Sequence, residues 1–167
     1  MTELHSSCKP TRTNRIALGI GIMKRYLDNC CFNRPFDDQL QRRIRRESEA
    51  KLKVQEAIRS GLFELIWSYM LDYENNKNPF RERRDRIGKW RMYASEDIQE
   101  DEGIYETAVM VNRHGIKKLD SLHIACAIGA AADYFVTTDD GILGKKAMLI
   151  HEIRITDPVE FVQEVSL

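Results

Sequence analysis

KKLDSLHIACAIGAAADYFVTTDDGIL (Lys117–Leu143) predicts a buried helix, a short strand and a turn. From Leu119 to Ala132, apolar or small residues occupy almost every helical face, which is typical of a helix packed against a sheet. Tyr134–Thr137 is a β-favouring run, and the TTDDG that follows is a turn sequence. Several small residues of the helix would let it approach the sheet closely: Ala125, Ala127, Gly129, Ala130 and Ala131.

An acidic residue stands at each end of this stretch. Asp120 lies in the first helical turn, where free backbone N–H groups and the helix dipole favour a carboxylate. Asp139 follows the strand, at the edge where α/β sheets open the crevice that binds ligands. If the helix runs antiparallel to the strand, the start of the helix and the end of the strand meet at one edge. We therefore expect both carboxylates in one cleft.

The composition sets limits on the class of protein. The chain has 167 residues, 43% of them hydrophobic, which suits one domain with a core. Lys plus Arg equals Asp plus Glu at 26 each, so a polyanion site must be a local patch. No apolar run approaches the length of a membrane span. The cysteines form no CxxC pair, which predicts reduced thiols and a cytoplasmic location and argues against a zinc site; they are Cys8, Cys30, Cys31 and Cys126.

Strands that alternate with helices along the rest of the chain predict an α/β fold with a parallel sheet. The expected strands are Met23–Leu27, Leu62–Trp67 and Met148–Ile155, and the loop NCCFNRPFDD follows Asp28. Helices are expected from Asp37–Asp38 to Ser60, from Ser68 through Glu74, from Asn78–Pro79, from Asp97–Glu100 to His114–Gly115, and from Asp157–Pro158.

Residues 1–22 differ from the remainder. Lys9, Arg12 and Arg15 precede the short apolar run IALGIGIM, as in a signal peptide, but no A-x-A cleavage site follows. We interpret residues 1–22 as a disordered or wrongly included leader and residues 23–167 as the domain.

Four short motifs then resemble the successive motifs of PIN-domain nucleases, including the VapC-type toxins: YLDNCCFNRPFDD, SYMLDYE, LDSLHIACA and FVTTDD. The resemblance covers nearly everything from Met23 onward. It implies a PIN-like three-layer fold with a central parallel sheet flanked by helices. It also implies that four acids act as catalytic residues and metal ligands: Asp28, Glu74 (six residues after Ser68), Asp120 and Asp139. Asp140 stands beside Asp139, and the T-x-D pattern favours Asp139.

The same resemblance implies an endoribonuclease that uses Mg²⁺ or Mn²⁺ to hydrolyse RNA by metal-activated water. Carboxylate oxygens are the ligands that these ions prefer. The leading role is the toxin of a toxin–antitoxin pair, with RNA, a small antitoxin protein and a second copy of the chain as partners. The alternatives are a non-catalytic PIN scaffold that binds RNA or protein, and a housekeeping RNA-processing or DNA-directed nuclease. Four mutually repelling carboxylates argue against the scaffold.

Several further residues have two readings each. Arg83 and Arg86, with Trp90 nearby, could bind RNA phosphates and a base, or form a solvated charged face. Arg34 could border the cleft, or tie the loop to Asp37 or Asp38. Thr137 and Thr138 could hold water at the metal, or shape the turn. His123, one turn after Asp120, could act as a base or ligand, or pack as an ordinary buried histidine.

Overall fold

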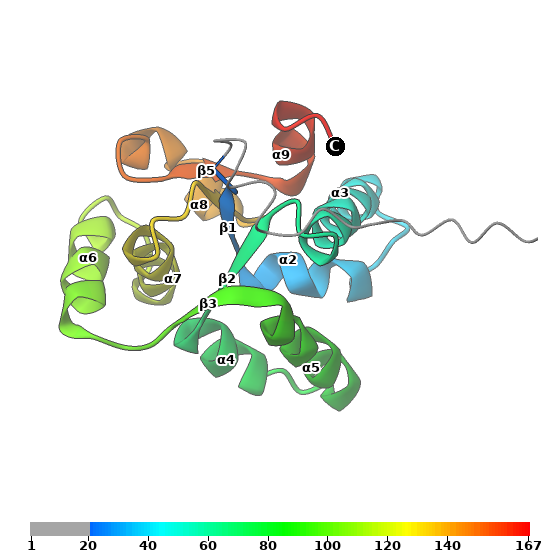
Figure 1. The fold of residues 1–167 in the computed structure, drawn as a ribbon, viewed down its shortest axis with the longest axis horizontal. Helices are drawn as coiled ribbons and strands as arrows, with labels where there is room; N and C mark the ends of the chain where they lie inside the picture. The colour runs from blue at the N-terminus through cyan, green and yellow to red at the C-terminus, as the bar shows by residue number, and fades with distance from the viewer. Residues whose placement is uncertain (1–20) are drawn as a thin grey trace, which may run out of the picture.

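Five parallel strands form the central sheet of the computed structural model, which describes residues 21–167 (Figure 1). Their order across the sheet is β3-β2-β1-β4-β5, so the first strand lies at the centre. Their bounds are Lys24–Leu27 (β1), Glu64–Ser68 (β2), Ala94–Ile98 (β3), Tyr134–Val136 (β4) and Arg154–Thr156 (β5). The prediction of an α/β fold with a parallel sheet flanked by helices is confirmed.

Burial separates the central strands from the edge strand β3. In β1, β2 and β4 nearly every side chain is buried, as expected for parallel strands covered on both faces. In β3, half-buried residues alternate with exposed ones, and its sequence ASEDI carries two acids. Its polar sequence is the reason that no strand was expected at this position.

Helices cover both faces of the sheet, and Figure 1 shows α6 and α7 on one side with α2 and α3 on the other. The helix α9 packs against α3. The bounds are Asn29–Asn33 (α2), Arg42–Arg59 (α3), Tyr69–Asn76 (α4), Arg81–Gly88 (α5), Glu102–Asn112 (α6), Lys118–Gly129 (α7), Asp140–Leu143 (α8) and Pro158–Glu164 (α9). Short 3₁₀ helices are Arg34–Phe36 (η1), Lys89–Tyr93 (η2) and Lys146–Leu149 (η3).

The small residues of α7 serve two contacts. Ala125 and Ala127 are fully buried, as expected for a helix wedged into the core. Gly129 faces α6 instead of the sheet, because a Cβ at that position would lie 2.5 Å from the Cδ1 atom of Ile104. Close approach between the two helices therefore depends on Gly129.

Two expected segments are wrong in type. The predicted loop 29–38 is mostly helical, since Asp28 caps α2 and Pro35 lies in η1. The predicted strand Met148–Ile155 begins with the end of η3 and becomes β5 only at Arg154. An apolar run without helical spacing does not distinguish a 3₁₀ turn from a strand.

Helix starts were predicted with mixed success. Ser68 caps α4 by accepting from the N–H of Leu71, and Asp157 caps α9, as expected. The helix expected to start at Asn78 begins instead at Arg81, after Phe80. The helix expected from Asp97 is capped by Asp101, because Asp97 belongs to β3.

The leader assigned to residues 1–22 lies outside the described residues except for its last two. Within residues 21–167, no helix is long and apolar enough to cross a membrane. Cys30, Cys31 and Cys126 are free thiols in this part of the chain, in line with the prediction.

Candidate active site

The site is built where β1 and β4 end side by side. The backbone N–H of Asp28 donates to the carbonyl of Val136 at 2.9 Å, which fixes the two strand ends relative to each other. The Asp28 carboxylate is buried, caps α2 at the N–H of Asn29, and accepts a 2.7 Å hydrogen bond from the hydroxyl of Thr137. The Thr137 hydroxyl also accepts from the backbone N–H of Asp139. Thr137 thus positions the segments that carry both acids.

Two hydrogen bonds and one ion-pair contact connect Ser68 of β2 with Glu74 on α4. The hydroxyl of Tyr26 lies 2.6 Å from Ser68 Oγ and 2.6 Å from His123 Nδ1. The other ring nitrogen of His123, Nε2, lies 3.1 Å from Glu74 Oε2, at ion-pair distance but outside hydrogen-bond geometry. Ser68 and Glu74 are therefore connected through the core as well as by their spacing in sequence.

The charges of this pair stabilise each other. Burial lowers the pKa of His123, but the Glu74 carboxylate and then Asp28 and Asp120 outweigh it and raise that pKa above its usual value. Burial raises the pKa of Glu74, but His123 outweighs it and lowers the pKa. The imidazole of His123, held by Tyr26, orients the Glu74 carboxylate. His123 is accordingly buried as the plainer reading expected, and it also contacts a predicted site residue.

The four predicted acids converge electrostatically on Asp120. Partial burial raises the pKa of Asp120, and the negative charges of Asp28, Asp139 and Glu74 raise it further. Lys117 opposes them only weakly. Acids from β1, α4, α7 and the turn after β4 thus face one another at the carboxyl edge of the sheet, where the antiparallel arrangement of α7 and β4 predicted a shared cleft.

Asp139 and Asp140 have different partners. Asp139 caps α8 by accepting from the N–H of Ile142, and its charge acts on Asp120. Asp140 is exposed and forms a two-point ion pair with Arg43 of α3, at 2.8 and 2.6 Å, which lowers the pKa of Asp140. Asp139 is therefore the residue directed toward the other acids.

Three ligand atoms in this cluster are close enough to share a metal ion. One atom each from Asp28, Glu74 and His123 lies within 4.8 Å of the other two. Carboxylate oxygens suit Mg²⁺ and Mn²⁺, and an imidazole is acceptable to Mn²⁺. Mutual repulsion at Asp120 is a second feature that a divalent cation would relieve. The residues present therefore fit a divalent metal.

The predicted substrate-binding residues lie in varied surroundings. Thr138 is buried, and its carbonyl lies 3.4 Å from the guanidinium of Arg43. Arg34 is paired with Glu47 at 2.6 Å and with Asp37 at 3.3 Å, so the structural tie includes a residue that we did not predict.

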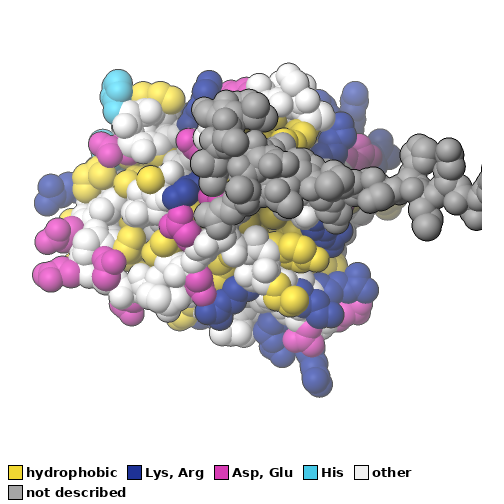
Figure 2. Space-filling model, viewed as in Figure 1, with side chains coloured by type: hydrophobic (Ala, Val, Ile, Leu, Met, Phe, Trp, Pro, Cys, Tyr) yellow, Lys and Arg dark blue, Asp and Glu magenta, His cyan; other side chains and the backbone are white. Residues whose placement is uncertain are grey.

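The two arginines of α5 are also engaged. Arg83 donates to the carbonyl of Phe36 at 2.7 Å, and Arg86 pairs with Glu82 on the exposed surface. Figure 2 shows Lys and Arg side chains gathered on the side of the molecule where α3 and α5 lie. Their role in binding RNA stays a prediction.

Sequence reasoning missed three residues at the site. Cys30 places its sulfur 3.3 Å from both Asp28 Oδ2 and Thr137 Oγ1, so it lies beside the carboxylates instead of in the core. Arg43 lies beside the site, where it pairs with Asp140 and approaches the carbonyl of Thr138, and Tyr26 contacts His123. Tyr26 carried a signal, since a tyrosine inside a buried strand needs a partner for its hydroxyl.

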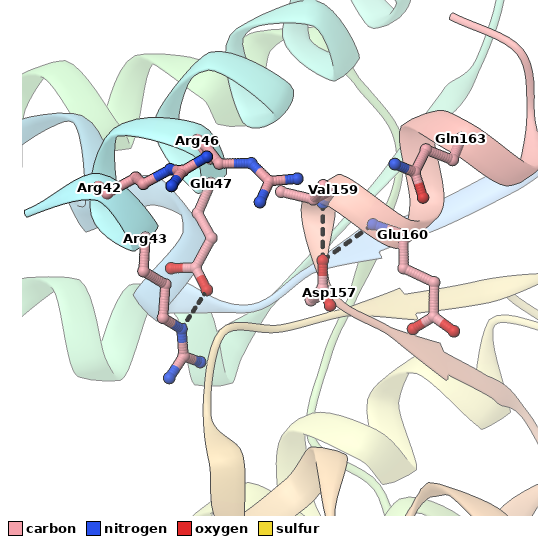
Figure 3. Close-up of a pocket in the computed structure, with 8 residues that line it drawn as sticks. All are labelled: Arg42, Arg43, Arg46, Glu47, Asp157, Val159, Glu160 and Gln163. Carbon is pink, nitrogen blue, oxygen red and sulfur yellow. Dashed lines mark hydrogen bonds and ion pairs between the residues drawn. The ribbon is translucent and has the colours of Figure 1, made fainter.

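A large open cavity lies next to the acids but contains none of the four. It has a volume of about 700 Å³ between α3 and α9, and Figure 3 shows Arg42, Arg43 and Arg46 along its α3 side. Asp157 faces them but is occupied in capping the first turn of α9.

Comparisons with known proteins give little beyond the fold. No protein-family model matches the chain, and no curated protein matches it either. Among solved structures, the crystal structure of VapBC2 from Rickettsia felis bound to a DNA fragment from their promoter is similar, with a TM-score of 0.48 and 15% sequence identity. The match covers 81% of this chain and 98% of that chain.

Proposed function

We propose that this chain is a PIN-type endoribonuclease that depends on Mg²⁺ or Mn²⁺. The observation that carries the proposal is the convergence of Asp28, Glu74 and Asp139 on Asp120, which raises the pKa of Asp120. Gathering like charges is costly, and a chain that needed only a stable fold would gain by neutralising one of them. Perturbed carboxylates in a cleft are a mark of functional sites.

Each residue has a distinct part in the proposal. Asp28, Glu74, Asp120 and Asp139 would hold the cation, and Tyr26 with His123 would orient Glu74. The ion, when bound, would neutralise charge on a phosphodiester and lower the pKa of water at that point. Thr137 keeps Asp28 and the segment of Asp139 in register, so that the two carboxylates stay aligned without rearrangement.

The activity is tested with the full-length protein and a labelled RNA that has single-stranded and hairpin parts. We expect cleavage with Mg²⁺ or Mn²⁺ and none with EDTA. Asp120→Asn should reduce the rate by at least about 100-fold, the scale of a lost electrostatic contribution to the transition state. Asp120 is the better choice than Asp28, because Asp28 also caps α2.

The matched control is Asp140→Asn, which removes a neighbouring acid that pairs with Arg43 instead of facing the cluster. It should keep the wild-type rate. Full activity in Asp120→Asn would refute the proposal. Cleavage of DNA in preference to RNA would favour the DNA-directed alternative, and RNA binding without cleavage at any metal concentration would favour the scaffold.

The biological role that we infer is the toxin of a toxin–antitoxin pair, which could act as a homodimer. A toxin requires a small partner that is made with it. A short reading frame adjoining this gene, whose product copurifies with the chain and suppresses RNA cleavage, is the expected finding. A gene without such a neighbour would favour a housekeeping nuclease.

A further inference from the structure

Lys51 is a buried lysine that has no acidic partner among the described residues. Its exposed fraction is 4%, and its Nζ lies 5.4 Å from the ring centroid of Phe32 and 6.0 Å from that of Trp90. Burial lowers the pKa of Lys51 to about 7, a change that Cys31 only partly opposes. The two rings offer the amine cation–π contacts but no hydrogen-bond acceptor or counter-ion, so its burial is only partly compensated.

Gln55 repeats the pattern one helical turn further along α3. It is also 4% exposed, and its Nε2 is buried without a hydrogen-bond partner in the described part of the chain. Residues four apart lie on the same helix face. Native proteins pair nearly all buried donors, so the unpaired Gln55 Nε2, one helical turn from a lysine that has no acidic partner, points to an acceptor supplied from outside.

Both side chains line one cavity of about 480 Å³ between α3, η1, α5 and η2. Its lining includes the exposed ring of Tyr93 and the buried rings of Phe32 and Trp90, whose centroids lie 6.5 Å apart. Four cationic residues and no carboxylate line it. The Arg59 guanidinium lies 4.7 Å from the Trp90 ring centroid, at the rim. The cavity thus suits a flat ligand that has hydrogen-bond acceptors and carries negative charge nearby.

An unstacked nucleobase meets these requirements better than an acidic side chain does. Bases in single-stranded RNA are held between aromatic rings and guanidinium planes, with hydrogen bonds to their edges. Guanine presents two adjacent acceptors, O6 and N7, whereas adenine presents one acceptor and one donor at the same edge. Two donors on one helix face therefore match guanine. A lone carboxylate would satisfy Lys51 but leave the aromatic walls unused.

We propose that this cavity, lined by Lys51 and Gln55, binds one unpaired guanine of an RNA substrate. Lys51 and Gln55 donate to the base, while Arg59 and Lys89 at the rim contact flanking phosphates. The proposal rests on the proposed ribonuclease function. Phe32, which forms part of the wall, is four residues after Asp28, a rise of about 6 Å along α2. One short helix therefore connects the base pocket to the carboxylates.

The test measures binding without cleavage, by fluorescence anisotropy of the full-length protein in EDTA. The probes are two labelled hexaribonucleotides: all uridine, and uridine with one central guanine. Wild type should prefer the guanine probe. Lys51→Met keeps the length of the side chain and removes its donor, so it should weaken guanine-probe binding by about tenfold or more and leave the uridine probe unchanged. Gln55→Leu should act in the same direction.

The control is Lys53→Met, which removes an exposed charge from the same helix and should change both probes equally and slightly. Lys51→Met should also melt no lower than wild type, because it replaces a mostly buried lysine that has no acidic partner by an apolar side chain. Equal affinity of wild type for the two probes, or an unchanged guanine preference in Lys51→Met, would overturn the proposal. The proposal would also be overturned if the protein bound a labelled peptide rich in Asp and Leu, and if Lys51→Met lost binding to this peptide but not to the RNA probes. None of these results depends on catalysis, so they stay separate from failure of the nuclease assay.

Discussion

Replacing Asp120 by asparagine should stabilise the metal-free protein. Partial burial and the charges of Asp28, Asp139 and Glu74 raise the pKa of Asp120, so its ionised form costs folding free energy. The cleft is partly open, and solvent reduces each pairwise repulsion to a few tenths of a kcal/mol, as for surface pairs. Three such repulsions sum to about 1 kcal/mol, which corresponds to roughly 2–4 °C in melting temperature for a chain of this size.

The raised pKa of Asp120 determines how the stability gain of Asp120→Asn depends on pH. A carboxyl group whose pKa is higher in the folded than in the unfolded protein stabilises the fold while it is protonated. This stabilisation is complete below the unfolded pKa of about 4, and it is lost as pH rises through the folded pKa. The gain from Asp120→Asn in EDTA should therefore be present at pH 7 and disappear near pH 4. Mn²⁺ stabilises the wild type by binding only the folded state, and the variant should show a smaller Mn²⁺ shift.

The assay is a thermal melt of both proteins with EDTA and with Mn²⁺. Asp140→Asn serves as the matched control, because loss of its pairing with Arg43 should not raise the melting temperature or alter the Mn²⁺ shift. If Asp120→Asn melts lower than wild type in EDTA and keeps the full Mn²⁺ shift, Asp120 only supports the start of α7. The metal site would then lie elsewhere.

Three further predictions concern the supporting structure. Tyr26→Phe removes the hydroxyl that contacts buried Ser68 and His123, so it should lower the free energy of unfolding by about 1–3 kcal/mol and reduce RNA cleavage. The control Tyr105→Phe changes an exposed residue and should do neither; thermal melts and initial cleavage rates measure both effects. Because the pKa of His123 is raised, its stabilising contribution is complete below about pH 6.5 and is lost as pH rises through the folded pKa. His123→Gln should flatten this part of the pH–stability profile, measured in EDTA. An unchanged profile would contradict the pairing of His123 with Glu74. Gly129→Ala places a methyl group 2.5 Å from Cδ1 at the end of the Ile104 side chain, which must move, and should cost about 1 kcal/mol; Gly88→Ala meets its nearest neighbour at 3.7 Å and should melt like wild type.

The order of strands and helices could be predicted from the sequence better than the side-chain contacts that support them. Hydrophobic patterns located four of the five strands in whole or in part, most clearly β2 and β4, which are buried on both faces and contain short apolar runs. The strand β3 was missed since an edge strand needs no such run. The helix α2 was missed because Asp28, taken as the end of a strand, also caps the next helix.

The candidate site shows the same division. The acids that follow strands or begin helices converge because the topology brings the ends of those strands and the starts of those helices to one edge of the sheet. The order of strands and helices in the sequence is enough to predict this. The Tyr26–His123 contact joins residues 97 apart and depends on the depth of two side chains in the core. The sulfur of Cys30 bonds to Asp28 because α2 turns it toward the site. Such contacts depend on helix rotation, which short motifs do not specify.

The polar edge strand β3 has a consequence for self-association. Exposed strand edges attract the edges of other chains, and acidic side chains on an edge oppose such pairing. In β3, Glu96 pairs with Lys24 and Asp97 pairs with Arg91, so both acidic side chains are held next to the strand. A second copy that added its own β3 would bring four carboxylates together. Edge-to-edge pairing of two β3 strands should therefore not form in a homodimer of this chain.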